Sequence, residues 1–164
     1  SFVRLYPLWG KEKLLEFARR LAENKPVWMA GNTEAIMLVA NGEQPMMCGA
    51  YYSSTMRIIS RAPDTPLGIA IPKQVGANLY ATMAVVKGAR YPNAALLLAG
   101  YLASDEGQKA YRSVFRDSPF DEGSEFGKKI KEAGAKVVFS GWDFTPEKET
   151  EVVNWMLQVW GFRK

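Results

Sequence analysis

The stretch that decides the fold runs from Gly31 to Tyr52 and reads GNTEAIMLVANGEQPMMCGAYY. Its first residues have the chemistry of a helix start. Asn32 or Thr33 can cap the free backbone N–H groups there, and Glu34 suits the positive end of the helix dipole. An Asn-Gly pair follows the apolar run and accommodates the left-handed residue that ends many helices. The stretch therefore predicts a helix between these two motifs.

The second half of the stretch predicts a strand that ends in two phenols. Pro45 interrupts the chain, and the β-prone residues 46–50 then lead directly to Tyr51 and Tyr52. Loops at strand ends are where α/β proteins bind ligands. The helix-then-strand unit is therefore expected to place polar, ligand-capable side chains at an edge of a sheet.

The rest of the chain also alternates apolar helical patterns with short strand-like runs. The predicted helices cover residues 10–23, 33–41, 93–102, 105–115, part of 120–133 and 145–160, and the predicted strands cover 27–29, 46–50, 67–71, 81–87 and 136–139. Residues 56–60 fit either a further strand or the end of a helix that follows the tyrosines. This alternation predicts an α/β fold with a mixed sheet flanked by helices.

Composition excludes several classes of function. The chain has 164 residues, a net charge of +4, one cysteine and no histidine. Without histidine there is no Ser-His-Asp or Cys-His catalysis and no His-based metal site within the chain. Basic and acidic residues are interspersed, whereas a nucleic-acid interface needs a clustered basic face. No phosphate-binding glycine motif is present. The sequence therefore predicts neither an enzyme nor a nucleic-acid-binding protein.

Two groups of motifs resemble extracellular solute-binding proteins that serve ABC importers. The first comprises Gly31-Asn32-Thr33, the Gly-Glu-x-Pro-Met of residues 42–46 and the tyrosine pair. The second comprises VVKGARYPNAA at residues 85–95 and YLASDEGQ at residues 101–108, which are similar to the family's turns into two successive helices. The ferric-iron-binding branch of the family carries a tandem tyrosine at the end of a comparable segment.

The resemblance implies a type 2 periplasmic-binding-protein-like fold, of which this chain is expected to be the C-terminal part of a two-lobed protein. Residues 1–80 and 119–164 would form the second lobe. Residues 81–118 would return toward the missing first lobe, with leucines built to pack on it. The fragment is therefore expected to self-associate or to pair with the missing lobe, because large exposed apolar patches are rare on monomers.

The resemblance also implies a function. The chain would be the solute-binding component of an ABC import system, located in the periplasm or outside the cell, with a permease in the membrane as its partner. It would capture ferric iron or an iron–anion complex in an interlobe cleft by hinge closure. Fe³⁺ would be the transported ligand, and no cofactor is required. The alternatives are a small organic or phosphorus-containing anion as ligand, or a non-transport relative such as a ligand-sensing domain of the same fold.

Within this interpretation, Tyr51 and Tyr52 are the expected metal ligands. A phenolate is a hard anionic oxygen donor and suits a hard, highly charged cation. Adjacent residues of a regular strand point to opposite faces, so both phenols reach one metal only if the backbone turns at this point. Ser53 and Ser54 favour such a turn. The alternative is that both tyrosines are packing residues.

Three more residues are candidates for ligand contact. Asn32 and Thr33 stand at a helix start that faces the cleft in the family, where free N–H groups suit an anion. Arg57 lies shortly after the tyrosines and has the charge to hold a carboxylate or phosphate oxygen. The alternatives are an ordinary helix cap for the first two residues and a surface position for Arg57.

Overall fold

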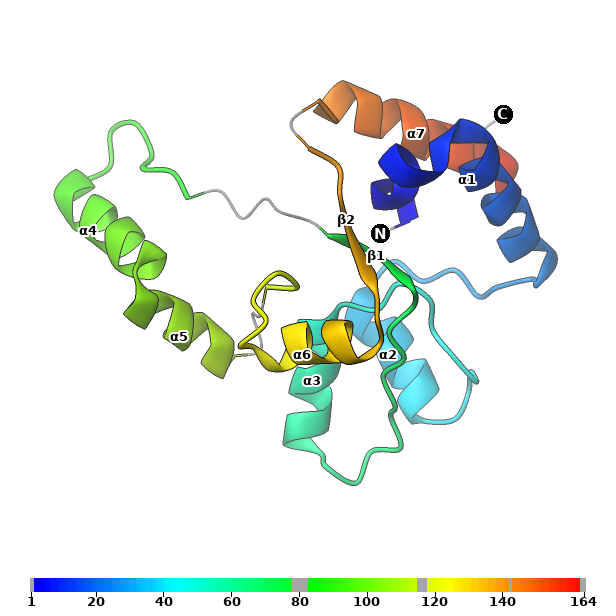
Figure 1. Cartoon of the computed structure of the whole chain (residues 1–164), viewed down its shortest axis with the longest axis horizontal. Coiled ribbons are helices and arrows are strands. Elements are labelled where there is room, and N and C mark those ends of the chain that lie inside the picture. Colours follow the sequence, from blue (N-terminus) through cyan, green and yellow to red (C-terminus); the bar gives the residue numbers. More distant parts are fainter. Residues whose placement is uncertain (1, 78–82, 115–117, 142, 163–164) are drawn as a thin grey trace.

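The computed structural model describes residues 2–77, 83–114, 118–141 and 143–162 as an α/β fold with more helix than strand. A two-stranded parallel sheet lies near its centre, and the N-terminal helical segment packs against it (Figure 1). Its elements are the 3-10 helix η1 (Phe2–Leu5), α1 (Tyr6–Glu23), α2 (Asn32–Ala40), α3 (Tyr52–Arg61), β1 (Gln74–Ala77), α4 (Pro92–Ala103), α5 (Asp105–Ser113), α6 (Glu125–Glu132), β2 (Lys136–Phe139) and α7 (Pro146–Val159).

The sheet joins two segments that are far apart in the sequence. Gln74 of β1 pairs with Lys136 of β2, and the register continues to Ala77 and Phe139. Parallel strands need a long crossover connection, and here it contains α4, α5 and α6. Helix α6 leads almost directly into β2, so the strand pairing fixes where α6 lies.

The main hydrophobic core lies between α1 and α7. Helix α7 begins with a side-chain cap, in which the Thr145 hydroxyl accepts a hydrogen bond from the backbone N–H of Lys148, and Pro146 occupies the first turn. The indole N–H of Trp160 donates to the carbonyl of Ala18 at 3.1 Å, which joins the end of α7 to α1. The buried members of this core are Leu14, Ala18, Phe144, Val152 and Met156.

Most predicted helices are confirmed, with shifted ends. Helix α1 begins at Tyr6 rather than residue 10, and it bends at Gly10, whose positive φ of 68° interrupts the helical backbone. Residues 56–60 belong to α3, so their strand alternative was wrong. The segment predicted as a helix within 120–133 is α6, and β2 has the predicted bounds.

The predictions of strands at residues 27–29, 46–50 and 67–71 were wrong. These segments are extended or turn-like but pair with no strand among the described residues, and a strand is defined by its pairing. Their apolar side chains are correspondingly exposed, as Val27 (55%) and Met46 (68%) show. The predicted strand at 81–87 begins outside the described residues, and no strand is present at 83–87. The mixed sheet is therefore a two-stranded parallel sheet in the described part of the chain.

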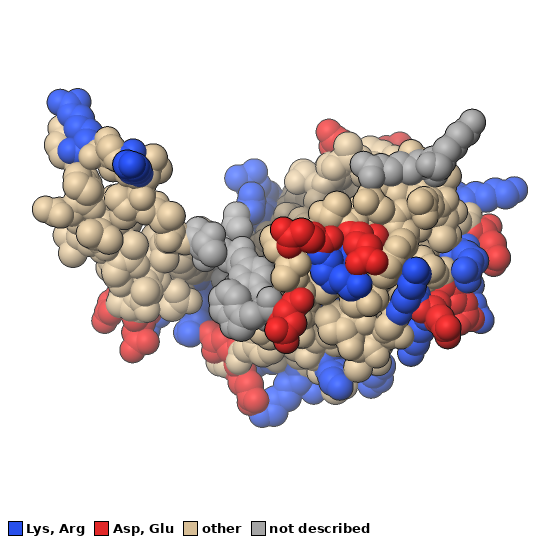
Figure 2. Space-filling view, turned by 90° about the horizontal axis from the view of Figure 1, so that it is seen from above, with Lys and Arg blue, Asp and Glu red and all other residues tan. Residues whose placement is uncertain are grey.

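Residues 83–114, which we call the arm, extend away from the rest of the molecule (Figure 1). Helix α4 packs on α5 and has no buried residue, although its sequence contains no charged side chain. Figure 2 shows a largely uncharged surface along the arm, with charged side chains toward its ends. Despite this apolar character, no helix among the described residues is long and apolar enough to cross a membrane. The lobe boundaries at residues 80 and 119 stay a prediction.

The exposed leucines of α4 predict that the chain self-associates. Leu96, Leu97 and Leu98 are 60%, 76% and 57% exposed, and a helix that is apolar on all sides is normally buried. We expect Leu97→Glu to shift the chain toward the monomer in sedimentation velocity runs at high concentration. Gln158→Glu adds the same charge on α7 and should leave the distribution unchanged. A stable monomer for the unsubstituted chain at high concentration would contradict this expectation.

The buried core predicts a large loss of stability for Leu14→Ala. Leu14 is fully buried between α1 and α7, so its truncation leaves a cavity that costs about 2–5 kcal/mol of unfolding free energy. Leu8→Ala is the matched control, because Leu8 is 36% exposed. Urea unfolding of both variants measures the difference. Equal losses for the two variants would show that the α1–α7 interface is not the main core.

Candidate functional site

The structure brings the starts of two helices together. Helix α2 begins at Asn32, and helix α3 begins at Tyr52. The Asn32 side-chain oxygen Oδ1 accepts a hydrogen bond from the backbone N–H of Tyr51 at 3.3 Å, and α2 packs against α3. The two ends of the stretch that opens the sequence analysis therefore meet in space. We call Asn32, Thr33, Tyr51 and Tyr52 the helix-start cluster.

The prediction that Asn32 or Thr33 caps α2 was wrong. Gly31 occupies the cap position with extended backbone angles (φ −108°, ψ 135°), and its carbonyl accepts from the N–H of Ala35 at 3.1 Å. Asn32 and Thr33 are therefore already inside the helix, where their side chains cannot fold back to cap it. The Asn32 side chain crosses to Tyr51 instead.

The tyrosine pair lies at a helix start and not at a strand end. Tyr51 is extended (φ −78°, ψ 123°) and Tyr52 is the first residue of α3, so the chain changes direction between them. Ser53 and Ser54, which were expected to favour a turn after a strand, instead lie in the first turn of α3. The Tyr51 side chain is 59% exposed, and the Thr55 hydroxyl donates to the Tyr51 carbonyl at 3.1 Å. The backbone of Tyr51 is therefore held on both sides while its phenol faces solvent.

The ring of Tyr52 stacks on the ring of Phe126, a residue that the sequence analysis did not identify. The ring centroids are 4.3 Å apart and the ring planes differ by 16°. Phe126 stands in the first turn of α6, whose start the Ser124 hydroxyl caps by accepting from the N–H of Gly127 at 3.0 Å. Ser124 followed by the acidic Glu125 was a signal for this helix start, but no local pattern pointed to the stacking partner.

The carboxylates near Phe126 are engaged with lysines. Glu125 contacts Lys128 at 2.9 Å and Glu122 contacts Lys131 at 2.7 Å. The hydrogen bond from each lysine, followed by its charge, lowers the pKa of the glutamate that it contacts. These carboxylates are therefore ionised and paired at the exposed surface of α6 and the loop before it, where surface ion pairs add little stability.

The described part of the chain contains no group of three or more Asp, Glu, Cys or His side chains placed to hold a metal ion. Arg57 lies on the exposed surface of α3, more than one helical turn beyond Tyr52, and its ligand role stays a prediction. A metal ion at the helix-start cluster would therefore be held by the two phenols and by other donors, and not by a cluster of carboxylate or thiol groups in the described residues.

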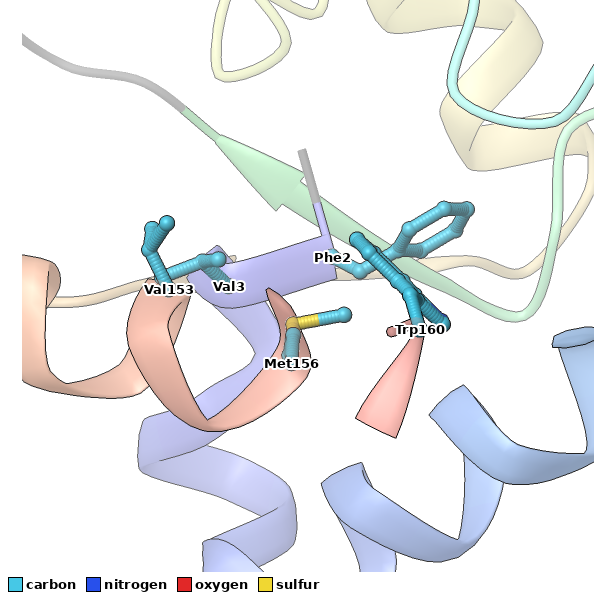
Figure 3. A pocket seen from close by; sticks show the side chains of 5 residues that line it. All are labelled: Phe2, Val3, Val153, Met156 and Trp160. Atoms are coloured by element: carbon cyan, nitrogen blue, oxygen red, sulfur yellow. The ribbon is translucent and has the colours of Figure 1, made fainter. Parts of the chain in front are cut away.

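A small apolar pocket lies elsewhere, between η1 and α7 (Figure 3). It has a volume of about 150 Å³ and is lined by Phe2, Val3, Val153, Met156 and Trp160. None of these side chains carries a charge, and none belongs to the helix-start cluster. The pocket therefore does not suit a charged solute.

Comparison with known proteins identifies a family. The family model described as "Bacterial extracellular solute-binding protein" matches residues 9–137, which include the helix-start cluster, the arm and β1. No curated protein and no solved structure matches the chain.

The contact between Asn32 and Tyr51 predicts unequal effects of two neighbouring substitutions. Asn32→Ala removes the acceptor that joins the two helix starts, whereas Thr33→Ala removes no observed hydrogen bond of the described chain. Both changes raise helix propensity by a similar amount, so this contribution cancels. We expect Asn32→Ala to be less stable than Thr33→Ala by about 0.5–1.5 kcal/mol in urea unfolding. Equal stabilities would mean that this hydrogen bond does not hold the cluster together.

Proposed function

Since the chain belongs to the family of bacterial extracellular solute-binding proteins, we propose that it captures its solute at the helix-start cluster for delivery to an ABC importer. Family membership gives the general role, which is solute binding in the periplasm or outside the cell with an ABC permease as partner. Such families typically bind their solutes without transforming them. We place the site at this cluster because a charged solute is bound by several polar groups that lie close to one another.

The backbone of the cluster suits an anion. The first N–H groups of any helix have no partner within the helix, and the helix dipole makes this end positive. In α2 the intrahelical bonds begin with the N–H of Ala35, and in α3 the N–H groups of Ser54 and Thr55 bond to the Tyr51 carbonyl. The starts of the two helices adjoin, because the Tyr51 N–H donates to the Asn32 side chain and α2 packs against α3. This adjacency of two helix starts is the observation that carries the proposal.

The phenols add a preference for a hard cation. The exposed Tyr51 phenol and the stacked Tyr52 phenol are adjacent in the chain, and phenolate oxygen suits ferric iron. A ferric ion with a bound anion would use both kinds of group, the phenolates for the metal and the helix starts for the anion. Ferric iron, alone or as an iron–anion complex, is therefore our leading ligand.

A metal-free anion is the second candidate. It is favoured by the two helix starts and by the lack of a three-membered acidic or thiol cluster among the described residues. A small organic or phosphorus-containing anion would use the same N–H groups and would leave the phenols as packing or hydrogen-bonding groups. A non-transport ligand-sensing domain would use the same contacts, since fold and site geometry do not distinguish it from a transport protein.

We further propose that a second lobe completes the site. The arm with its exposed leucines would pack on that lobe, and ligand capture would occur by closure of the two lobes about a hinge. Residues 1–80 and 119–164 would then move as one body, and residues 81–118 would follow the other. The additional ligands of a ferric ion would come from the second lobe.

Titration with ferric citrate tests the ligand. Ferric phenolate gives a visible charge-transfer band, so we expect the protein to become coloured on addition of the ferric salt. The double variant Tyr51→Phe with Tyr52→Phe keeps both rings but should lose the band. We expect its ferric binding to weaken by more than about 100-fold, because even residues that only support metal ligands change metal affinity by about 10–100-fold. Tyr91→Phe, which changes an exposed tyrosine next to α4, is the control.

Two outcomes would change the proposal. A band that persists in the double variant would remove the tyrosines from the metal site. Without a band in the unsubstituted protein, binding of inorganic phosphate or citrate by calorimetry would favour the metal-free anion. No binding of either ligand would contradict the cluster as a solute site.

A further inference from the structure

We propose that Phe126 is a positioning residue for Tyr52, which holds the Tyr52 phenol in the orientation that ferric binding needs. This inference rests on the proposed function of the helix-start cluster. Phe126 itself has no donor atom and does not contact the ligand in this account. Its effect is exerted through the ring of Tyr52.

The contact between the two rings is specific. A centroid separation of 4.3 Å with an interplanar angle of 16° is a stacked arrangement, and aromatic pairs contribute about 0.5–1.5 kcal/mol beyond the area that they bury. A stacked neighbour restricts rotation of the Tyr52 side chain about its bonds. The phenol oxygen at the far end of a restricted ring then samples fewer positions.

Phe126 is itself firmly held. The Ser124 hydroxyl donates to the Asp121 carbonyl at 2.8 Å and accepts from the Gly127 N–H, so the start of α6 is tied to the preceding loop. Gly127 is packed so closely that an added Cβ would clash with the Asp121 carbonyl oxygen. Arg112 of α5 also contacts the Asp121 carboxylate at 2.6 Å. The loop before Phe126 thus has several fixed points.

Each of the two tyrosines is held by a residue from a different part of the sequence. Asn32 of α2 accepts from the Tyr51 N–H, while Phe126 of α6 covers the Tyr52 ring. Supporting residues around metal ligands typically change metal affinity by about 10–100-fold when they are removed. We therefore expect Phe126 to influence ferric binding although it cannot coordinate a metal.

The test compares three variants in the ferric citrate titration. Phe126→Leu keeps an apolar side chain but removes the stack, and we expect ferric affinity to fall by about 10–100-fold with a shifted or weaker charge-transfer band. Phe126→Trp restores a flat ring and should recover most of the affinity and the band. Phe120→Leu, in the exposed loop before α6, is the matched control and should behave as the unsubstituted protein.

Thermal unfolding of each variant, monitored by circular dichroism, separates positioning from folding. The inference is supported if Phe126→Leu stays folded at the titration temperature, loses affinity, and is rescued by Phe126→Trp. Unchanged affinity and band in folded Phe126→Leu would overturn it while the proposed iron site stands. No band in the unsubstituted protein would overturn the iron site and this inference together. If Phe126→Leu is unfolded, Phe126→Met is measured in its place with the same criteria.

Discussion

The pairing of β1 with β2 is the constraint on which the rest of the structure depends. Four residue pairs join segments separated by the whole arm and α6, so the loop that they close is long and entropically costly. The paired strands pack against η1 and α1, and β2 connects α6 to α7 along the chain. The pairing therefore links the segment that carries Phe126 to the core around Leu14.

The helix-start cluster illustrates how a binding site can be built from backbone groups. Most proteins satisfy the first N–H groups of a helix with a side-chain cap, as Ser104, Ser124 and Thr145 do here. Helices α1, α2, α3 and α4 lack such a cap, and among these the starts of α2 and α3 adjoin. These two adjoining starts form the cluster that we propose as the site.

Local signals in the sequence predicted the helices well. Thr145 with Pro146, and Ser104 before α5, cap their helices, and such caps can be recognised locally because a cap involves only neighbouring residues. The strands at 27–29, 46–50 and 67–71 could not be judged locally, since a strand requires a partner from elsewhere in the chain. The hydrogen bond between Asn32 and Tyr51 was not predicted, although the resemblance to the solute-binding family made both residues ligand candidates. Phe126 could not have been predicted, because its contact depends on the long-range pairing that positions α6.

The central claim is that solute binds where the two helix starts meet. Amide NMR of the labelled chain during titration, with ferric citrate and separately with inorganic phosphate, tests it most directly because it reports on each backbone N–H. We predict that the largest shifts or losses of signal occur at residues 31–34 and 51–54, with smaller changes at Phe126. Changes concentrated instead at residues 2–3 and 153–160, around the apolar pocket, would contradict the account.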